Sequence, residues 1–159
     1  GTKMRKECLQ FLIEKAHKDK DIYLITPDMG FGILDDFKEL FPDRFINCGV
    51  AEQTAINIAI GLVLAGKKPW VYGIITFTFY KALEQIRNYV TRLKLPIKFI
   101  LIGKDMTYSG LDFTHWALED QAIAKAIDFT CHEPEDHFQL KYELDAVYEQ
   151  QSPAYLRIG

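Results

Sequence analysis

The sequence is poor in cysteine, with Cys8, Cys48 and Cys131 as its only thiols among 159 residues. These cysteines are odd in number and widely spaced, and they form no CxxC pair or Cys/His cluster, which argues against a disulfide framework and against a zinc site. We therefore expect no metal site on this chain. Reduced, mostly buried thiols indicate a cytoplasmic protein.

Long apolar runs and segregated basic charge are also missing. No run approaches the ~20 apolar residues that span a bilayer. Residues 1–12 lack the apolar core and cleavage site of a signal peptide. The formal net charge is −3, and Lys and Glu are mixed along the chain, so there is no basic stripe to neutralise a phosphate backbone. We therefore expect neither a membrane nor a nucleic acid as the main partner.

Present instead are short apolar segments that alternate between strand and helix patterns. With 48% hydrophobic and 26% charged residues, the chain suits one globular domain over residues 1–159. Helical spacing predicts helices over residues 4–17, 33–40, 51–65, 80–93, 118–127 and 136–150. Strands are predicted over residues 21–26, 44–48, 70–75, 97–102, 129–133 and 154–158. This order predicts a three-layer α/β/α fold, with a mainly parallel open sheet of about six strands.

The helix predicted over residues 51–65 is the most informative segment. Apart from its first turn and Asn57 it is almost entirely apolar, so we expect apolar surface to enclose most of it. Glu52 lies in that first turn, where an ionisable group is costly unless it has a use. Ligands of parallel sheets bind beyond the carboxyl ends of the strands. Glu52, the aromatic residues near position 78 and His115, in an irregular segment over residues 104–116, should therefore share one end of the sheet.

Four motifs, in this order and spacing, resemble the pyrimidine-binding domain of the transketolase family. They are GVAEQ at residues 49–53, AGKKP at 65–69, TFTFYKALEQI at 76–86 and THWALED at 114–120. The likeness extends from the first predicted helix to YLRIG at residues 155–159. It implies that this chain holds the aminopyrimidine ring of thiamine diphosphate.

Glu52 matches the family's glutamate, which hydrogen-bonds N1′ of the aminopyrimidine and so helps to deprotonate the thiazolium carbon. That role requires a carboxylate in a dry site, where a shared proton stabilises most. The alternative is a first-turn glutamate stabilised by the helix dipole. The flanking GVxEQ and the apolar helix favour the catalytic role.

Phe77, Phe79 and Tyr80 match the family's aromatic residues that stack on the pyrimidine ring. A flat heteroaromatic ring needs the face of an aromatic side chain to stack on. An aromatic core cluster is expected to account for at least one of the three. Asp28 resembles an aspartate that lies near the cofactor in some members, and a turn-forming role beside Pro27 explains it nearly as well.

His115 matches the family's histidine that points at the substrate, and a solvated or structural histidine is the alternative. Two neighbours depart from the family pattern. Leu111 stands where transketolases and deoxyxylulose-phosphate synthases have an aspartate, and Trp116 stands where glutamine is usual. Recognition of the sugar hydroxyls is therefore expected to differ.

The family binds the diphosphate and its Mg²⁺ through a different domain, which carries a GDG sequence that residues 1–159 lack. Its C-terminal domain is likewise expected to be absent. The resemblance thus implies one subunit of a split, thiamine-diphosphate-dependent transketolase-like enzyme. A separate diphosphate-binding subunit would complete the active site, in a homodimer or an α2β2 heterotetramer that acts on sugar phosphates.

Other functions stay open. A deoxyxylulose-phosphate-synthase-like or 2-oxoacid-decarboxylating subunit would use pyruvate or another 2-oxoacid as its donor. A non-catalytic module that keeps the fold is the alternative from another class.

Overall fold

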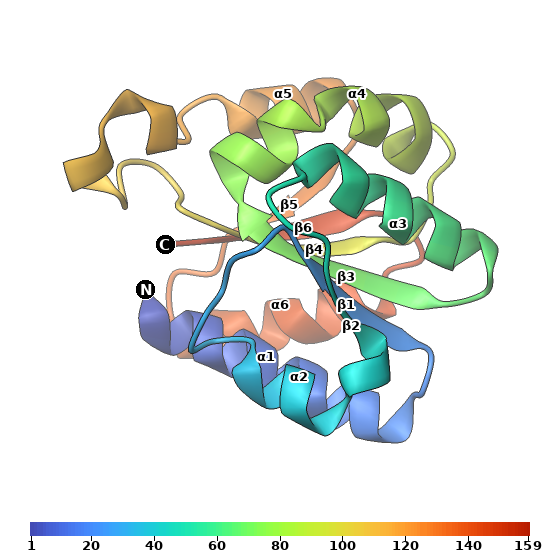
Figure 1. Cartoon of the computed structure of the whole chain (residues 1–159). Helices are drawn as coiled ribbons and strands as arrows, with labels where there is room; N and C mark the ends of the chain where they lie inside the picture. The colour runs from blue at the N-terminus through green and yellow to red at the C-terminus, as the bar shows by residue number, and fades with distance from the viewer.

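A computed structural model describes residues 1–159, and its strands form a single sheet in which all neighbours run parallel. The sheet has six strands in the order β2-β1-β3-β4-β6-β5. The strands are β1 (Ile22–Thr26), β2 (Phe45–Asn47), β3 (Lys68–Ile74), β4 (Lys98–Ile102), β5 (Thr130–His132) and β6 (Ala154–Ile158). The predicted α/β fold with a parallel sheet is confirmed (Figure 1).

Helices cover both faces of the sheet, so the molecule has three layers (Figure 1). On one face lie α1 (Thr2–Lys18), α2 (Asp35–Leu40) and α6 (His137–Glu149). On the other lie α3 (Glu52–Leu64), α4 (Leu83–Gln85) and α5 (Asp120–Ala126). None of these helices combines the length and the apolar character that crossing a membrane requires.

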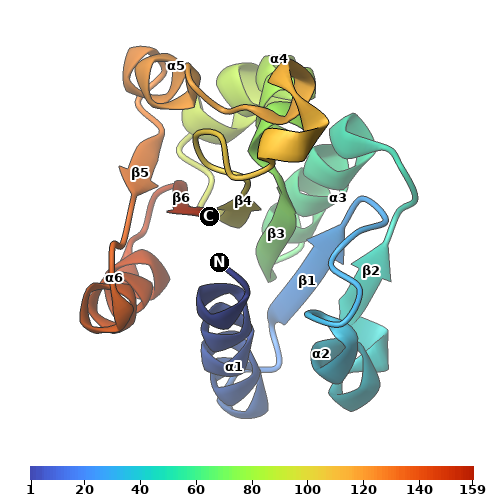
Figure 2. The same ribbon diagram turned by 90° about the vertical axis from the view of Figure 1, so that its left-hand side faces the viewer.

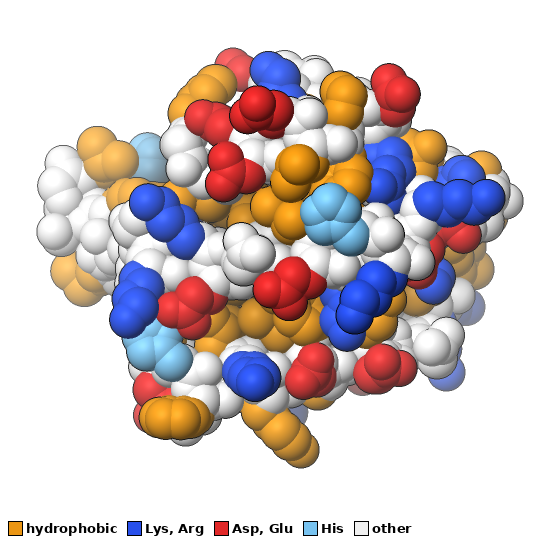
Figure 3. All heavy atoms as spheres, turned by 90° about the horizontal axis from the view of Figure 1, so that it is seen from below, with side chains coloured by type: hydrophobic (Ala, Val, Ile, Leu, Met, Phe, Trp, Pro, Cys, Tyr) orange, Lys and Arg blue, Asp and Glu red, His pale blue; other side chains and the backbone are white.

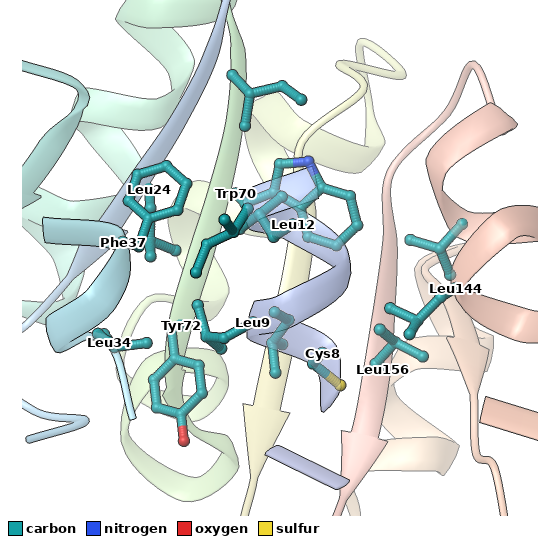
Figure 4. Close-up of a cluster of buried hydrophobic side chains, with 14 of the residues drawn as sticks. Cys8, Leu9, Leu12, Leu24, Leu34, Phe37, Trp70, Tyr72, Leu144 and Leu156 are labelled. Atoms are coloured by element: carbon teal, nitrogen blue, oxygen red, sulfur yellow. The ribbon is translucent and has the colours of Figure 1, made fainter. Parts of the chain in front are cut away.

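Each face of the sheet has its own hydrophobic core, because successive strand side chains point to opposite faces. Trp70 and Tyr72 of β3 pack on the α1 side with Leu9 and Leu12 of α1 (Figure 4). Val71, between them, belongs to the core under α3 and α5. A strand buried on both faces has no polar alternation, which is why the strands of this sequence are nearly continuous apolar runs. The outer surface of α1, α2 and α6 mixes acidic and basic side chains around hydrophobic ones (Figure 3).

The helix predicted over residues 80–93 begins earlier than expected and is irregular. Helical backbone starts directly after β3 with wide π-type turns, η2 (Ile75–Phe79), and a second such segment, η3 (Ile86–Thr91), follows α4. The chain folds back tightly at this point: a Cβ on Gly73 would lie 1.9 Å from Oγ1 of Thr78. The aromatic residues predicted to bind the pyrimidine therefore lie on a helical turn packed against the end of β3.

The carboxyl ends of the strands lie on the side viewed in Figure 2, near both termini of the chain. After β1 the chain passes to α2 on one face, and after β3 it passes to α4 on the opposite face. Because β1 and β3 are neighbours in the sheet, the two connections diverge at this point. Such a divergence is the usual position of a ligand crevice in an open parallel sheet.

Candidate active site

Glu52 is the first residue of α3 and lies at the carboxyl end of the sheet, after a turn at Gly49 with φ 78°. Only 8% of the residue is exposed. Its carboxylate borders a pocket of about 360 Å³. The pocket is lined by Val50, Ala51, Glu52, Gln53, Thr54 and Lys81. A nearly buried carboxylate at the edge of a pocket is available to a ligand that carries a proton donor.

Lys81 is the cation of this site, and sequence reasoning missed it. Its Nζ lies 3.8 Å from Oε2 of Glu52 and 5.2 Å from the centroid of the Phe77 ring. Gln53 fixes the backbone here, since its Nε2 donates to the Lys81 carbonyl oxygen at 3.2 Å. The only signal in the sequence was a cation directly after the aromatic run FTFY. The Lys81 ammonium thus borders both the acid and the aromatic ring.

His115 contacts the same aromatic ring, Phe77. Its ring centroid lies 4.8 Å from that of Phe77, with an interplanar angle of 83°. Nδ1 of His115 lies 3.0 Å from Oγ1 of Thr114. Lys81 thus links Glu52 to Phe77, and Phe77 contacts His115, although the three residues come from separate segments.

Phe79 and Tyr80 lie away from this group. Phe79 is fully buried and packs edge-on against Phe129 and Tyr155 in the core. The Tyr80 hydroxyl donates to Oε2 of Glu119 at 2.9 Å. Burial, and then the hydrogen bond with Glu119, raises the pKa of Tyr80 above its ordinary range, so the phenol stays protonated. The Phe79 ring, being fully buried, has no face free for a ligand.

Asp28 follows β1 and adopts a left-handed backbone conformation with φ 56°. It forms a reciprocal pair with Asn47 of β2: the Asp28 amide donates to Oδ1 of Asn47, and Nδ2 of Asn47 donates to the Asp28 carboxylate, both at 3.0 Å. Its side chain makes no hydrogen bond or ion pair with Glu52 or His115.

Cys48 lies four residues before Glu52. Burial, with a smaller effect of the Glu52 charge, raises the pKa of the Cys48 thiol.

The family described as "Transketolase, pyrimidine binding domain" matches residues 1–159. The chain belongs to this family. The resemblance that the motifs indicated is thereby confirmed.

Individual relatives agree with the family assignment. This pyrimidine-binding domain is 32% identical, over 157 residues, to a subunit of the apulose-4-phosphate transketolase of Phocaeicola vulgatus, in an alignment that covers 98% of this chain and 50% of that protein. It is 34% identical to the 1-deoxy-D-xylulose-5-phosphate synthase of an Acidovorax species (strain JS42), over 93% of this chain and 24% of that protein. The chain therefore spans half or less of the length of these relatives.

A solved structure described as "Split gene transketolase, inactive beta4 tetramer" has the same fold. It superposes on this pyrimidine-binding domain with a TM-score of 0.83 at 28% identity. That comparison covers 97% of this chain and 50% of that one.

The pyrimidine-binding domain exposes apolar side chains around the site. Phe31 and Val50, in the loops after β1 and β2, are each 76% exposed, and Phe113, beside His115, is 62% exposed. Val50 also lines the pocket beside Glu52, and an exposed apolar group beside a pocket is typical of an interaction surface.

The expectation that apolar surface encloses most of the α3 helix is wrong in this chain. One face, with Ala55, Ile56 and Ala59, is buried against the sheet. The opposite face is only partly covered, and Leu64 near its end is 75% exposed. The reason is that α3 belongs to an outer layer, so the sheet covers only one side of a helix that is apolar all round.

The residues of the site suit a flat heteroaromatic amine. Glu52 provides an acceptor whose nearest cation, at 3.8 Å, is too distant for a normal hydrogen bond. Phe77 adds an aromatic ring beside it. Thr76, on the same turn, has a buried hydroxyl with no hydrogen-bond partner within the chain. A buried polar group without a partner is where a ligand or a second chain would supply one.

Proposed function

We propose that this chain is one subunit of a thiamine-diphosphate-dependent enzyme of the transketolase type, and that residues 1–159 act as its single pyrimidine-binding domain. The observation that carries the proposal is the placement of Glu52, a residue that is 8% exposed at the edge of a pocket and is linked through Lys81 to Phe77, which contacts His115. This arrangement supports a role in which the Glu52 carboxylate shares a proton with the aminopyrimidine ring while the Phe77 ring packs against that aminopyrimidine. Glu52 and His115 are thus the proposed catalytic residues.

Thiamine diphosphate, when bound, would supply the nucleophilic thiazolium carbon of the reaction. The chain's own contribution is to hold and orient. Glu52 would hold a proton between its carboxylate and the ring nitrogen, and its burial makes that shared proton more stabilising than it would be in water. Phe77 would provide the stacking face. Phe79 instead supports the turn from the core, and Tyr80 does so through its bond with Glu119.

Lys81 would have to give way when the cofactor binds. Its ammonium lies near both Glu52 and the face of Phe77. The Lys81 side chain is 57% exposed, so it can turn into water at little cost. Asp28 lies at the same end of the sheet and could contact the cofactor after a change of partner from Asn47.

His115 is proposed to exchange a proton with a substrate oxygen. An imidazole suits this because one ring nitrogen can donate a hydrogen bond while the other accepts one. The edge-to-face contact with Phe77 and the short contact with Thr114 limit the orientation of the ring. Substrate binding and cofactor binding would thus share the Phe77 ring.

A partner chain is proposed to supply the diphosphate-binding domain with its GDG sequence and its Mg²⁺ ligands. The exposed side chains of Phe31, Val50 and Phe113, in loops at this end of the sheet, support this, because exposed apolar groups favour an interaction surface. A relative that is itself one subunit of a transketolase also favours it. We propose a homodimer or an α2β2 heterotetramer as the assembly. The cysteines are all free, which supports a reducing, cytoplasmic location.

The proposed reaction is transfer of a two-carbon ketol unit between sugar-type substrates. The 34% identity to a 1-deoxy-D-xylulose-5-phosphate synthase favours a second candidate, in which a 2-oxoacid is the donor. Turnover of ketose phosphate, against turnover of pyruvate, distinguishes the two with the reconstituted enzyme.

Titration calorimetry with thiamine diphosphate and Mg²⁺ tests the proposal. We expect weak binding by this chain alone and clear binding after it is mixed with a candidate subunit that carries a GDG sequence. Tight, Mg²⁺-dependent binding by the chain alone contradicts the split active site. Absence of binding with every such candidate favours a non-catalytic module.

A further inference from the structure

The segment that carries His115 is a closed loop rather than an open connection. At its neck the Asp105 amide donates to the Ala117 carbonyl oxygen at 3.1 Å, and the Ala117 amide donates to the Asp105 carbonyl oxygen at 3.0 Å. The neck therefore joins the two ends of a loop that leaves the sheet after β4 and returns before α5. His115 ends the short turn η5 (Phe113–His115), two residues before the neck.

Arg157 of β6 binds both ends of this neck, and nothing in the proposed mechanism uses it. Its Nη2 donates to the Ala117 carbonyl oxygen at 2.9 Å and to Oδ1 of Asp105 at 2.8 Å. Only 3% of the Arg157 side chain is exposed. The hydrogen bond from Arg157 lowers the pKa of the Asp105 carboxyl, so this contact is ionic at neutral pH.

The rest of the guanidinium is held by two further acids. Nε donates to Oδ2 of Asp120 at 3.0 Å, and Nη1 donates to Oε2 of Glu133 at 2.5 Å. Asp120 is fully buried and also accepts a hydrogen bond from the Tyr155 hydroxyl at 2.8 Å. A planar guanidinium has donors in fixed, separate directions and can make all these contacts at the same time. A lysine ammonium is a compact point charge and cannot reach several acids in this way. Arg157 is therefore a rigid attachment for the neck.

The middle of the loop is also constrained. Asp112 has φ 64° and ψ −169°, a backbone region that is essentially restricted to glycine. Its carboxylate accepts a hydrogen bond from the Phe113 amide at 2.7 Å, and its carbonyl oxygen accepts one from the His115 amide at 3.0 Å. Tyr108 packs over Gly103, where a Cβ would lie 2.8 Å from its ring. Strained backbone that its surroundings hold in place is typical of functional loops.

We infer that Arg157 and Asp105 are positioning residues that fix His115 against Phe77 by closing this loop at its neck. Neither residue needs to touch the substrate. The inference about His115 rests on the proposed function, whereas closure of the loop does not. Without the Asp105 contact the neck loses its ionic attachment, and the η5 turn can move relative to Phe77.

Replacing Arg157 itself is a poor first test, because it leaves the buried Asp120 carboxylate without its cation and threatens the fold. Asp105→Gly is better. Asp105 has φ 52°, which glycine adopts without strain. Asp128→Gly is the matched control, since Asp128 has φ 58° and lies in the turn before β5, away from the neck. Both variants make the same backbone change, and only one removes a contact with Arg157.

The first measurement is amide hydrogen exchange over residues 106–116 in the full chain, which requires neither cofactor nor partner. We expect faster exchange in Asp105→Gly and unchanged exchange in Asp128→Gly. Equal exchange in the wild type and in Asp105→Gly overturns the proposed closure. This result stands whether or not the chain is part of an enzyme.

The second measurement uses the enzyme reconstituted with its diphosphate-binding subunit. Misplacing a reacting group by about 1 Å can cost ~10²-fold, so we expect kcat/KM to fall by about 10- to 100-fold in Asp105→Gly. The double variant Asp105→Gly/His115→Ala should lose no more than His115→Ala alone, because Asp105 acts through His115. If the loss of kcat/KM in the double variant equals the sum of the two single losses in free energy, the inference about His115 is overturned, even if Asp105→Gly speeds amide exchange as expected. An enzyme that is inactive in its wild-type form refutes the proposed function and leaves the exchange result to decide closure.

Discussion

Replacing Glu52 with glutamine changes one atom of the site and tests its central residue. Glutamine keeps the volume of the side chain, and it can still form a hydrogen bond to a ring nitrogen. It cannot share a proton. Proton transfer by a positioned side chain contributes ~10²–10⁴-fold, which corresponds to about 3 to 6 kcal/mol at ~1.4 kcal/mol for each factor of ten. We expect the turnover of the reconstituted enzyme to fall by that factor.

The stability of the variant should change much less. Glu52 contributes a charge at the start of α3, and its ion pair with Lys81 spans 3.8 Å to a side chain that is 57% exposed. Each of these contributions is typically below about 1 kcal/mol. Melting temperature and cofactor affinity should therefore stay close to the wild-type values, while activation of the cofactor is lost.

The assay is hydrogen–deuterium exchange at the thiazolium carbon of thiamine diphosphate bound to the reconstituted enzyme. Glu84→Gln, the same substitution at an exposed residue of α4, is the control and should exchange like the wild type. Exchange in Glu52→Gln that equals the wild-type rate would refute the catalytic role. Glu52 would then be only a first-turn glutamate.

Further predictions concern the aromatic turn, the assembly and a buried lysine. Phe77→Leu should weaken cofactor binding with little change in melting temperature. Phe79→Ala should instead cost ~3–5 kcal/mol of stability, because it leaves a cavity at a fully buried site. If calorimetry and thermal melts show that Phe79→Ala weakens binding and Phe77→Leu lowers stability, then Phe79 is the ring that binds the cofactor. The chain should associate through its exposed apolar residues, so light scattering that finds only a monomer with every candidate subunit would contradict the proposed assembly. Burial lowers the pKa of Lys98 to about 8, from an ordinary value of about 10.4. Between these values the unfolded chain binds more protons than the folded chain, so the free energy of unfolding should rise with pH across that window. Lys98→Met should lack this rise, and parallel curves of melting temperature against pH for the two proteins would show that the lysine is not perturbed.

Local sequence patterns were sufficient to predict most of the fold. Each strand is a short apolar run and most helices have a clear apolar period, and both signals depend only on neighbouring residues. The motif GVAEQ placed Glu52 at the start of a helix, and the structure has α3 beginning at Glu52. The sequence pattern placed the start of the helix after β3 too far along the chain. The actual start depends on the close approach of Thr78 to Gly73, which the missing Cβ of Gly73 allows. That approach is a packing event without a periodic signal.

The sequence by itself determined the order of the elements, the parallel sheet and the end of the sheet at which Glu52 and His115 lie, since these follow from hydrophobic periodicity and chain connectivity. Tertiary structure alone decided which aromatic side chain faces the site: Phe77 and Phe79 are two residues apart on wide helical turns, and packing against Phe129 and Tyr155 buries the second. It also placed the Lys81 ammonium near Glu52 and closed the His115 loop through Arg157, which is 42 residues later in the chain (157 − 115). Contacts between charged groups so distant in sequence depend on three-dimensional distance, which no local pattern encodes.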